Sequence, residues 1–115
     1  TRLRYPGLSR GKDGYSYFGG KSGRERSKIY GGLLTENLVQ SLARDIVAEQ
    51  ALWIRAKVGP IVTTTHDEVV TSVPAARAEA AFLEAKAIMC RPPAWCADLP
   101  LNASGGFAVS YGAVK

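Results

Sequence analysis

The sequence predicts an α+β fold in which a small antiparallel sheet, containing a β-hairpin, packs against two helices. Two observations support this class. Apolar residues recur at helical spacing in two separate stretches, and two runs of β-branched residues lie between them. The predicted order of elements is ββ-α-ββ-α-β.

The first predicted helix covers residues 34–57 and is stopped by Gly59-Pro60. Its apolar side chains recur at three- and four-residue spacing, which is the signature of a buried stripe. The expected core residues of this helix are Leu38, Val39, Leu42, Ala43, Ile46, Val47 and Ile54.

The predicted hairpin joins the β-branched run 61–65 to the run 69–73. A tight turn falls at His66 and Asp67, and Glu68 leads into the second strand. The turn lacks the usual Asn-Gly or Asp-Gly pair. A bulky histidine in a tight turn breaks a local rule, and such exceptions are enriched at functional sites.

The second predicted helix opens at Pro74 and runs to about Cys90, before Arg91-Pro92-Pro93. The tail over residues 99–111 is expected to have short strand character around Gly105-Gly106. The core stripe of the second helix is predicted to be Ala78, Ala81, Phe82, Ala85 and Met89.

Residues 1–30 are predicted to form a basic arm of short strands and turns, and residues 31–115 the body of the fold. The arm carries eight Lys or Arg residues against two acidic residues, a net charge of +6, and the rest of the chain carries −1. This asymmetry favours a polyanionic partner, most economically nucleic acid. The alternative is a solvated basic loop. The aromatic residues of the arm, Tyr15, Tyr17 and Phe18, are expected to pack within the ribbon rather than stack on bases.

Several other features bound the class of protein. The chain begins at Thr1 without a methionine, inside an expected strand 1–5, so we expect a fragment, a processed product or half of a split protein. No apolar run approaches the roughly 20 residues of a membrane span. Cys90 and Cys96 lack the further ligands that a zinc site needs, and both are expected to be packing residues of a cytoplasmic protein.

The candidate chemistry lies at the hairpin tip, in the triplet His66, Asp67 and Glu68. Neighbouring strand residues alternate faces, so all three are not expected to hold one metal ion together. A tip can instead offer one carboxylate to a cleft. Aspartate is a natural partner for Mg²⁺, which usually takes one or two protein carboxylates plus phosphate oxygens. A small metal-dependent hydrolase using the triplet is one alternative, and it would need additional ligands.

Two segments carry a family resemblance: residues 30–45, YGGLLTENLVQSLARD, and residues 62–70, VTTTHDEVV. In this order they resemble the C-terminal palm of family A DNA polymerases, most closely the phage relatives of bacterial DNA polymerase I. The tail, with Pro92-Pro93-Ala94-Trp95 and Leu99-Pro100-Leu101, also looks like these phage enzymes. The resemblance covers essentially the whole chain and implies a partial polymerase palm, of which the hairpin is the catalytic motif C.

The resemblance implies roles for particular residues. Asp67 matches the carboxylate that binds catalytic Mg²⁺, Glu68 a supporting acidic neighbour, and His66 a residue near the primer terminus. Gln40 matches a glutamine that touches the duplex. Where the family commonly has an asparagine this chain has Glu36, which weakens the expectation of direct minor-groove contact from that turn. The expected DNA-binding residues are Gln40, Asn37 and Arg44 on the helix and Arg24, Arg26 and Lys28 in the arm.

The resemblance also implies missing parts. The other palm aspartate and the fingers helix lie upstream in these enzymes, and two-metal phosphoryl transfer needs carboxylates from both palm motifs. We therefore expect a half-site that is inactive alone. Its expected partners are primer–template DNA, deoxynucleoside triphosphates and an upstream chain with the fingers, thumb and rest of the palm, in the host cytoplasm if the gene belongs to a phage. The alternative is a non-catalytic nucleic-acid-binding module with a polymerase-derived fold.

Overall fold

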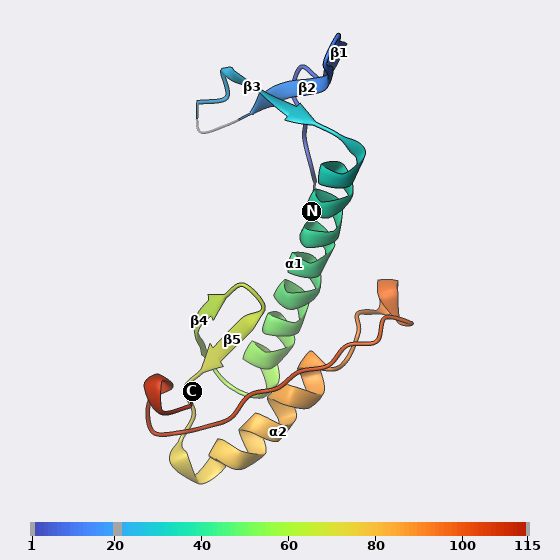
Figure 1. The fold of residues 1–115 in the computed structure, drawn as a ribbon. Helices are drawn as coiled ribbons and strands as arrows, with labels where there is room; N and C mark the ends of the chain where they lie inside the picture. Colours follow the sequence, from blue (N-terminus) through green and yellow to red (C-terminus); the bar gives the residue numbers. More distant parts are fainter. Residues whose placement is uncertain (1, 20–21, 115) are drawn as a thin grey trace. The chain divides into compact units, whose positions relative to one another are not determined.

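The computed structural model describes residues 2–19 and 22–114 and forms two compact units, Thr1–Ala43 and Arg44–Lys115. The described residues form two small antiparallel sheets and two α-helices (Figure 1), which confirms the predicted α+β class. Helix α1 (Gly31–Lys57) begins in the first unit and ends in the second. Within the described residues, no helix has the length and apolar character that crossing a membrane requires.

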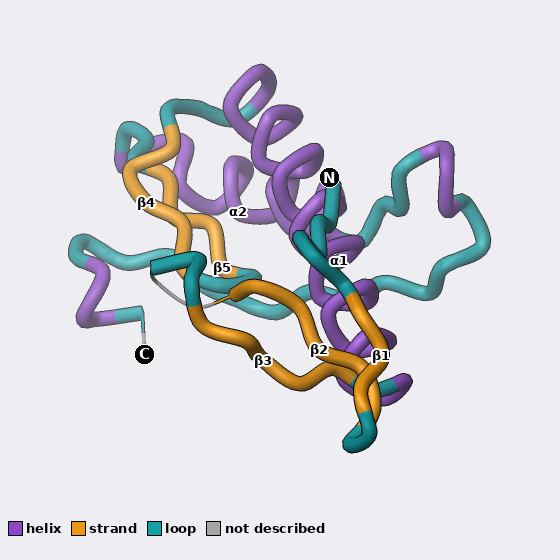
Figure 2. Tube along the Cα trace, turned by 90° about the horizontal axis from the view of Figure 1, so that it is seen from above, coloured by secondary structure: helices purple, strands orange, loops and turns teal. Residues whose placement is uncertain are grey.

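The first unit contains an antiparallel sheet of strands β1 (Ser9–Gly11), β2 (Gly14–Gly19) and β3 (Glu25–Ile29), in that spatial order (Figure 2). The arm therefore contributes three strands within the described residues, where two were predicted. The strand expected at the start of the chain is absent from residues 2–5, and Thr1 lies outside the described residues.

One face of this sheet is covered by neighbouring parts of the same unit. Ile29 is buried, and the ring of Tyr17 meets the ring of Tyr5 edge-on, with centroids 5.0 Å apart. Asn37 of α1 donates from Nδ2 to the phenol oxygen of Tyr5 over 3.1 Å. Tyr17 thus packs within the unit, as the sequence predicted, whereas Tyr15 on the same face is 50% exposed.

The buried stripe predicted along α1 is wrong for its N-terminal half. Leu38, Val39 and Leu42 are 51%, 58% and 43% exposed, and Ala43 is exposed as well. Further along, Ile46 and Ile54 are buried and Val47 is half-buried. Helical periodicity identifies a face that can be buried, but actual burial requires a facing element, and among the described residues nothing covers the start of this stripe.

The second unit is built around a hairpin of β4 (Ile61–Thr65) and β5 (Glu68–Thr71), with helix α2 (Ala78–Met89) after it. The core residues Ile54 and Val58 come from the end of α1 and the residue following it, and Ala81 and Ile88 come from α2. Val69 and Val73, on and just beyond β5, pack against this cluster. The hairpin therefore packs against both helices, as predicted.

Gln50 links the two helices of this unit. Its side chain is 2% exposed, and Nε2 donates to the carbonyl oxygens of Met89 and Arg91 over 2.9 and 3.1 Å. These carbonyls stand at the end of α2, where a helix leaves its last acceptors without intrahelical donors. Sequence patterns did not reveal this role, because a glutamine inside a helix is ordinarily taken for a surface residue.

The start of α2 and the tail differ from prediction in detail. A short 3₁₀ turn (Ala75–Arg77) precedes α2, so the α-helix starts after Pro74 rather than at it. The strand expected around Gly105-Gly106 is absent from the described tail. The tail is held by side chains instead, with the Phe107 ring 6.0 Å from that of Phe82. Cys90 and Cys96 are free and half-buried.

Candidate functional site

The hairpin tip is a two-residue turn, because Thr65 and Glu68 are the last paired residues and His66 and Asp67 lie between them. His66 has a φ of 54°. This is the left-handed region, which costs an L-residue with a Cβ about 1–2 kcal/mol relative to the right-handed one. The structure therefore confirms the predicted turn and shows what its unusual histidine costs. A Gly or Asn would ease this backbone conformation.

The three residues of the tip differ in exposure and in contacts. His66 and Asp67 are exposed, and neither makes a hydrogen bond or ion pair with any described residue. Glu68 is half-buried, and its Oε1 accepts a hydrogen bond of 2.5 Å from the phenol of Tyr111. Asp67 is thus available to a ligand, while Glu68 is held by the tail. Sequence patterns did not reveal Tyr111, which is distant in sequence and lies in no motif.

The donor set at the tip fits part of a magnesium site. Asp67 presents a hard carboxylate oxygen ligand, and Mg²⁺ commonly takes one or two such groups from protein. In the part of the chain that the structure describes, no three His, Cys, Asp or Glu residues come together to hold a metal ion. The hydrolase alternative, which needs extra ligands around the triplet, gains no support from these residues.

The polar residues predicted to face DNA along α1 have different surroundings. Asn37 is half-buried and donates to Tyr5, as described above. Gln40 is exposed, and its Nε2 donates to Oε1 of Glu36 over 3.1 Å. Arg44 is exposed. Glu36 is therefore the residue that orients the Gln40 amide.

The basic residues of the arm also divide into two kinds. Arg24 and Lys28 are exposed. Arg26 is exposed too, but its guanidinium is engaged within the sheet: Nε donates to Ser16 Oγ over 3.0 Å, and Nη2 donates to the carbonyl of Ser16 over 3.1 Å. Nη2 also contacts the Gly7 carbonyl at 3.1 Å and the Ser9 hydroxyl, and the guanidinium carbon lies 4.7 Å from the centroid of Phe18.

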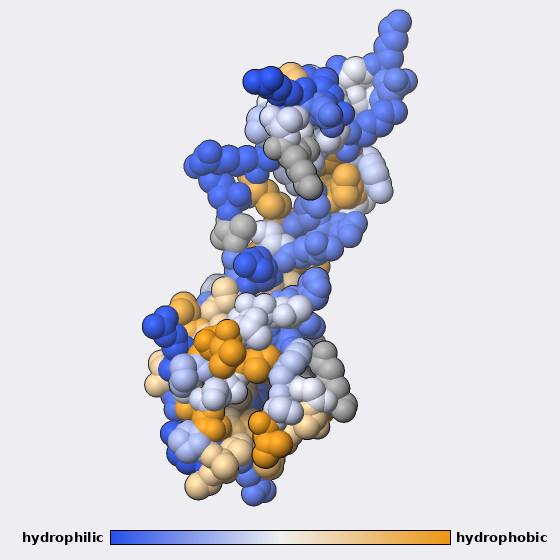
Figure 3. Space-filling view, turned by 90° about the vertical axis from the view of Figure 1, so that its left-hand side faces the viewer, coloured by the Kyte–Doolittle hydropathy of each residue, from blue (hydrophilic) through white to orange (hydrophobic). Residues whose placement is uncertain are grey.

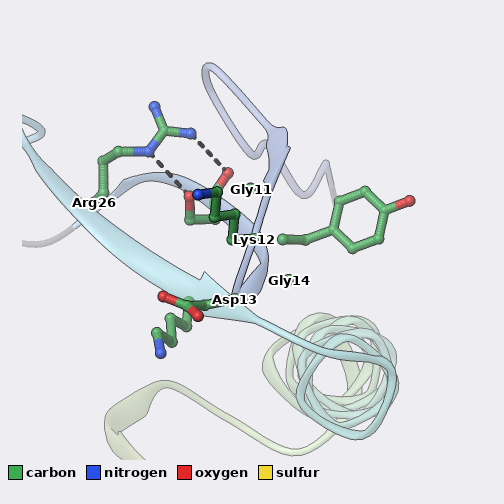
Figure 4. Close-up of a pocket in the computed structure, with 8 residues that line it drawn as sticks. Gly11, Lys12, Asp13, Gly14 and Arg26 are labelled. Carbon is green, nitrogen blue, oxygen red and sulfur yellow. Dashed lines mark hydrogen bonds between the residues drawn. The ribbon is translucent and has the colours of Figure 1, made fainter.

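A shallow hollow of about 240 Å³ lies beside this arginine in the first unit (Figure 4). Gly11, Gly14 and Ser16 are part of its lining, and these residues have no side chain or a small one. The other lining residues are Lys12, Asp13, Tyr15, Arg26 and Lys28. Three cationic side chains and one carboxylate therefore line the hollow, and its lining has a net positive charge.

Comparison with known proteins links the chain to DNA polymerases. It is 39% identical over 105 residues to the DNA polymerase of Bacillus phage SP02, and the match covers 88% of this chain. The same match covers 15% of the phage protein, so the chain spans a small part of the length of its curated relative. No protein-family model matches the chain, and no solved structure matches it.

Proposed function

We propose that this chain is the motif C segment of the palm of a family A DNA polymerase and acts in nucleotidyl transfer to a primer 3′ end. The similarity to a phage DNA polymerase over most of the chain carries the proposal. The hairpin tip supports it, because Asp67 is exposed there and its side chain has no hydrogen-bond or ion-pair partner among the described residues. One half of a two-metal site requires a carboxylate that is free to bind a metal ion and is held on a packed hairpin.

In this proposal each residue of the tip has one task. Asp67 is a ligand of the catalytic Mg²⁺ ions, which supply positive charge to the attacking and leaving oxygens when bound. Glu68 supports the site from the side, held by the hydrogen bond from Tyr111. His66 lies at the tip beside them and faces the primer terminus. Gln40, oriented by Glu36, contacts the duplex from α1.

The proposed activity needs an upstream chain with the other palm aspartate, the fingers and the thumb. Exposed apolar side chains support the existence of such a partner. Leu34, Leu38 and Leu42 stand at four-residue spacing on α1 and are 45%, 51% and 43% exposed. The second unit also presents apolar residues on the face drawn in Figure 3. Its exposed large apolar residues include Leu52, Val62, Leu83, Leu99, Phe107 and Val109. A row of exposed apolar side chains such as the one on α1 is typical of interfaces.

Primer extension tests the proposal. The purified chain, free of host polymerase, is expected to extend no primer. Addition of a polymerase chain that contains the upstream palm, fingers and thumb is expected to restore Mg²⁺-dependent, template-directed incorporation of nucleotides. Incorporation by the chain alone would refute the half-site. A complex that forms with the upstream chain but incorporates nothing would favour the non-catalytic binding module instead.

A further inference from the structure

We infer that the exposed face of the β1–β3 sheet binds the phosphodiester backbone of nucleic acid, with Lys12 and Lys28 contacting phosphates across the hollow. Arg26 holds the strands of this face in place. The inference takes nucleic acid as the partner from the proposed function but requires no polymerase reaction. It therefore stands or falls by binding measurements, separately from primer extension.

Strand register assigns the side chains to the two faces of the sheet. Ser16 pairs with Ser9 on one side and with Lys28 on the other, and Phe18 pairs with Arg26. Paired residues lie on the same face, and residues two apart along a strand share it as well. One face therefore carries Ser9, Ser16, Phe18, Arg26 and Lys28.

The opposite face carries a different set of residues. Tyr15 pairs with Arg10 and with Ile29, and Tyr17 pairs with Ser27. Ile29 is buried and Tyr17 packs on Tyr5, so this end of the opposite face is covered within the first unit, whereas Tyr15 is 50% exposed and lines the hollow as well. The face with Arg26 and Lys28 is the exposed one. On the side drawn in Figure 3, the sheet region is mainly hydrophilic.

Arg26 holds the strands of this face together and is not the residue that contacts phosphate. Its donors reach Ser16 on β2, Ser9 on β1 and the Gly7 carbonyl (the bonds to Ser16 are the dashed lines in Figure 4). It thus ties the three strands and the segment before them with one planar group, a geometry that lysine cannot reproduce. Its charge remains beside the hollow, where it adds to the attraction for anions.

Glycine and serine line the hollow together with the two lysines. A Cβ built on Gly14 would meet no atom within 4 Å, and one built on Gly11 would meet only the Gly14 carbonyl oxygen at 3.9 Å. A ligand backbone can therefore approach the sheet closely between Lys12 and Lys28. Phosphodiesters match this shape and charge, since lysine binds phosphate as a point charge and glycine allows a close approach.

Equilibrium binding of labelled single-stranded and duplex DNA to the full chain, across a salt series, tests the inference. Each phosphate contact contributes about 0.7 to the slope of log affinity against log salt for single strands and about 0.9 for duplex. The double variant Lys12→Gln/Lys28→Gln is expected to reduce the slope by about 1.4 or 1.8, depending on which DNA form the face binds. Arg55→Gln, which removes a charge from an exposed position in the second unit, is expected to leave it unchanged.

Two further variants test the shape of the site and the role of Arg26. Gly11→Leu fills the hollow without altering charge and is expected to weaken DNA binding at fixed salt. The matched control Gly31→Leu, at the start of α1, is expected to leave DNA binding unchanged. Arg26→Lys is expected to raise amide exchange in β2 and β3 while keeping most of the salt slope.

The inference is overturned by any of three results: no salt-dependent binding by the unaltered chain, an equal loss of slope in Arg55→Gln, or unchanged affinity in Gly11→Leu. If Arg26→Lys kept the sheet intact but abolished binding, Arg26 would be the phosphate contact, and its purely structural role in joining the strands would be wrong.

Discussion

The phenol of Tyr111 donates to Oε1 of Glu68 over 2.5 Å, which joins the tail to the first residue of β5. The two residues are 43 positions apart, and no sequence pattern connects them. Because Glu68 directly follows Asp67, this bond restrains one of the two carboxylates at the hairpin tip and leaves the other unengaged. The proposed roles of Asp67 as metal ligand and of Glu68 as supporting residue depend on this bond.

Tyr111→Phe is predicted to loosen the tip. Removing the phenol deletes one hydrogen bond to a half-buried carboxylate, which is typically worth about 0.5–1.5 kcal/mol of unfolding free energy. Amide exchange at residues 68–70 should rise, and urea unfolding of the second unit should shift accordingly. Tyr30→Phe is the matched control, since Tyr30 is exposed in the first unit. Equal effects of the two variants would contradict a specific role for Tyr111.

Asp67→Asn is predicted to abolish most turnover in the reassembled enzyme. Asparagine keeps the size and hydrogen-bonding capacity of the side chain but removes the charge that holds Mg²⁺. The loss in rate should be at least about 10²–10³, the usual cost of one preorganised electrostatic group. Glu68→Gln should cost less, because Glu68 is proposed to support the site rather than bind the ion.

Single-turnover incorporation and primer–template affinity, measured side by side, check this prediction. Affinity should barely change in Asp67→Asn, because phosphate contacts dominate DNA binding. Asp98→Asn, also exposed in the second unit, serves as the control for loss of one carboxylate. Near-normal turnover in Asp67→Asn, or a parallel loss of affinity and turnover, would rule out the assignment as a metal ligand.

His66→Gly is predicted to stabilise the second unit while lowering activity of the reassembled enzyme. Glycine relieves the left-handed conformation at φ 54°, and this gain exceeds its entropy cost by up to about 1 kcal/mol. His66→Ala removes the imidazole but retains a Cβ in the same conformation, so it should lower activity without stabilising the fold. Thermal unfolding of both variants distinguishes the backbone effect from the side-chain effect, and equal stabilisation by alanine would contradict it.

Gln50→Leu is predicted to destabilise the second unit by about 1–3 kcal/mol, since it leaves the carbonyl groups of Met89 and Arg91 without their donor. Gln40→Leu makes the same chemical change at an exposed site of the same helix and should alter stability by less than about 0.5 kcal/mol. Urea unfolding followed by circular dichroism measures both. Similar midpoints for the two variants would show that the buried contacts of Gln50 contribute little.

Much of the second unit could be predicted from local patterns. The hairpin, its turn at His66 and Asp67, the position of the second helix and the core role of Ile46, Ile54 and Ala81 all follow from periodicity and from β-branched runs. These features depend on residues close together in the sequence. The strand expected near Gly105 was wrong, because tail segments are placed by contacts such as Phe82 with Phe107, which local propensity does not encode.

The class of the fold, the acidic turn and the excess of positive charge in the arm can all be predicted from the sequence, since each depends on residue type and short-range spacing. Which charged side chains are available to a ligand depends on contacts that form in the folded chain. The Arg26 guanidinium donates hydrogen bonds to Ser16 and to the Gly7 carbonyl, and Glu68 accepts one from Tyr111. The Asp67 side chain has no hydrogen-bond or ion-pair partner within the described chain. The physical reason is that a side chain's availability depends on what lies opposite it in space, and those partners are up to 43 residues away in sequence.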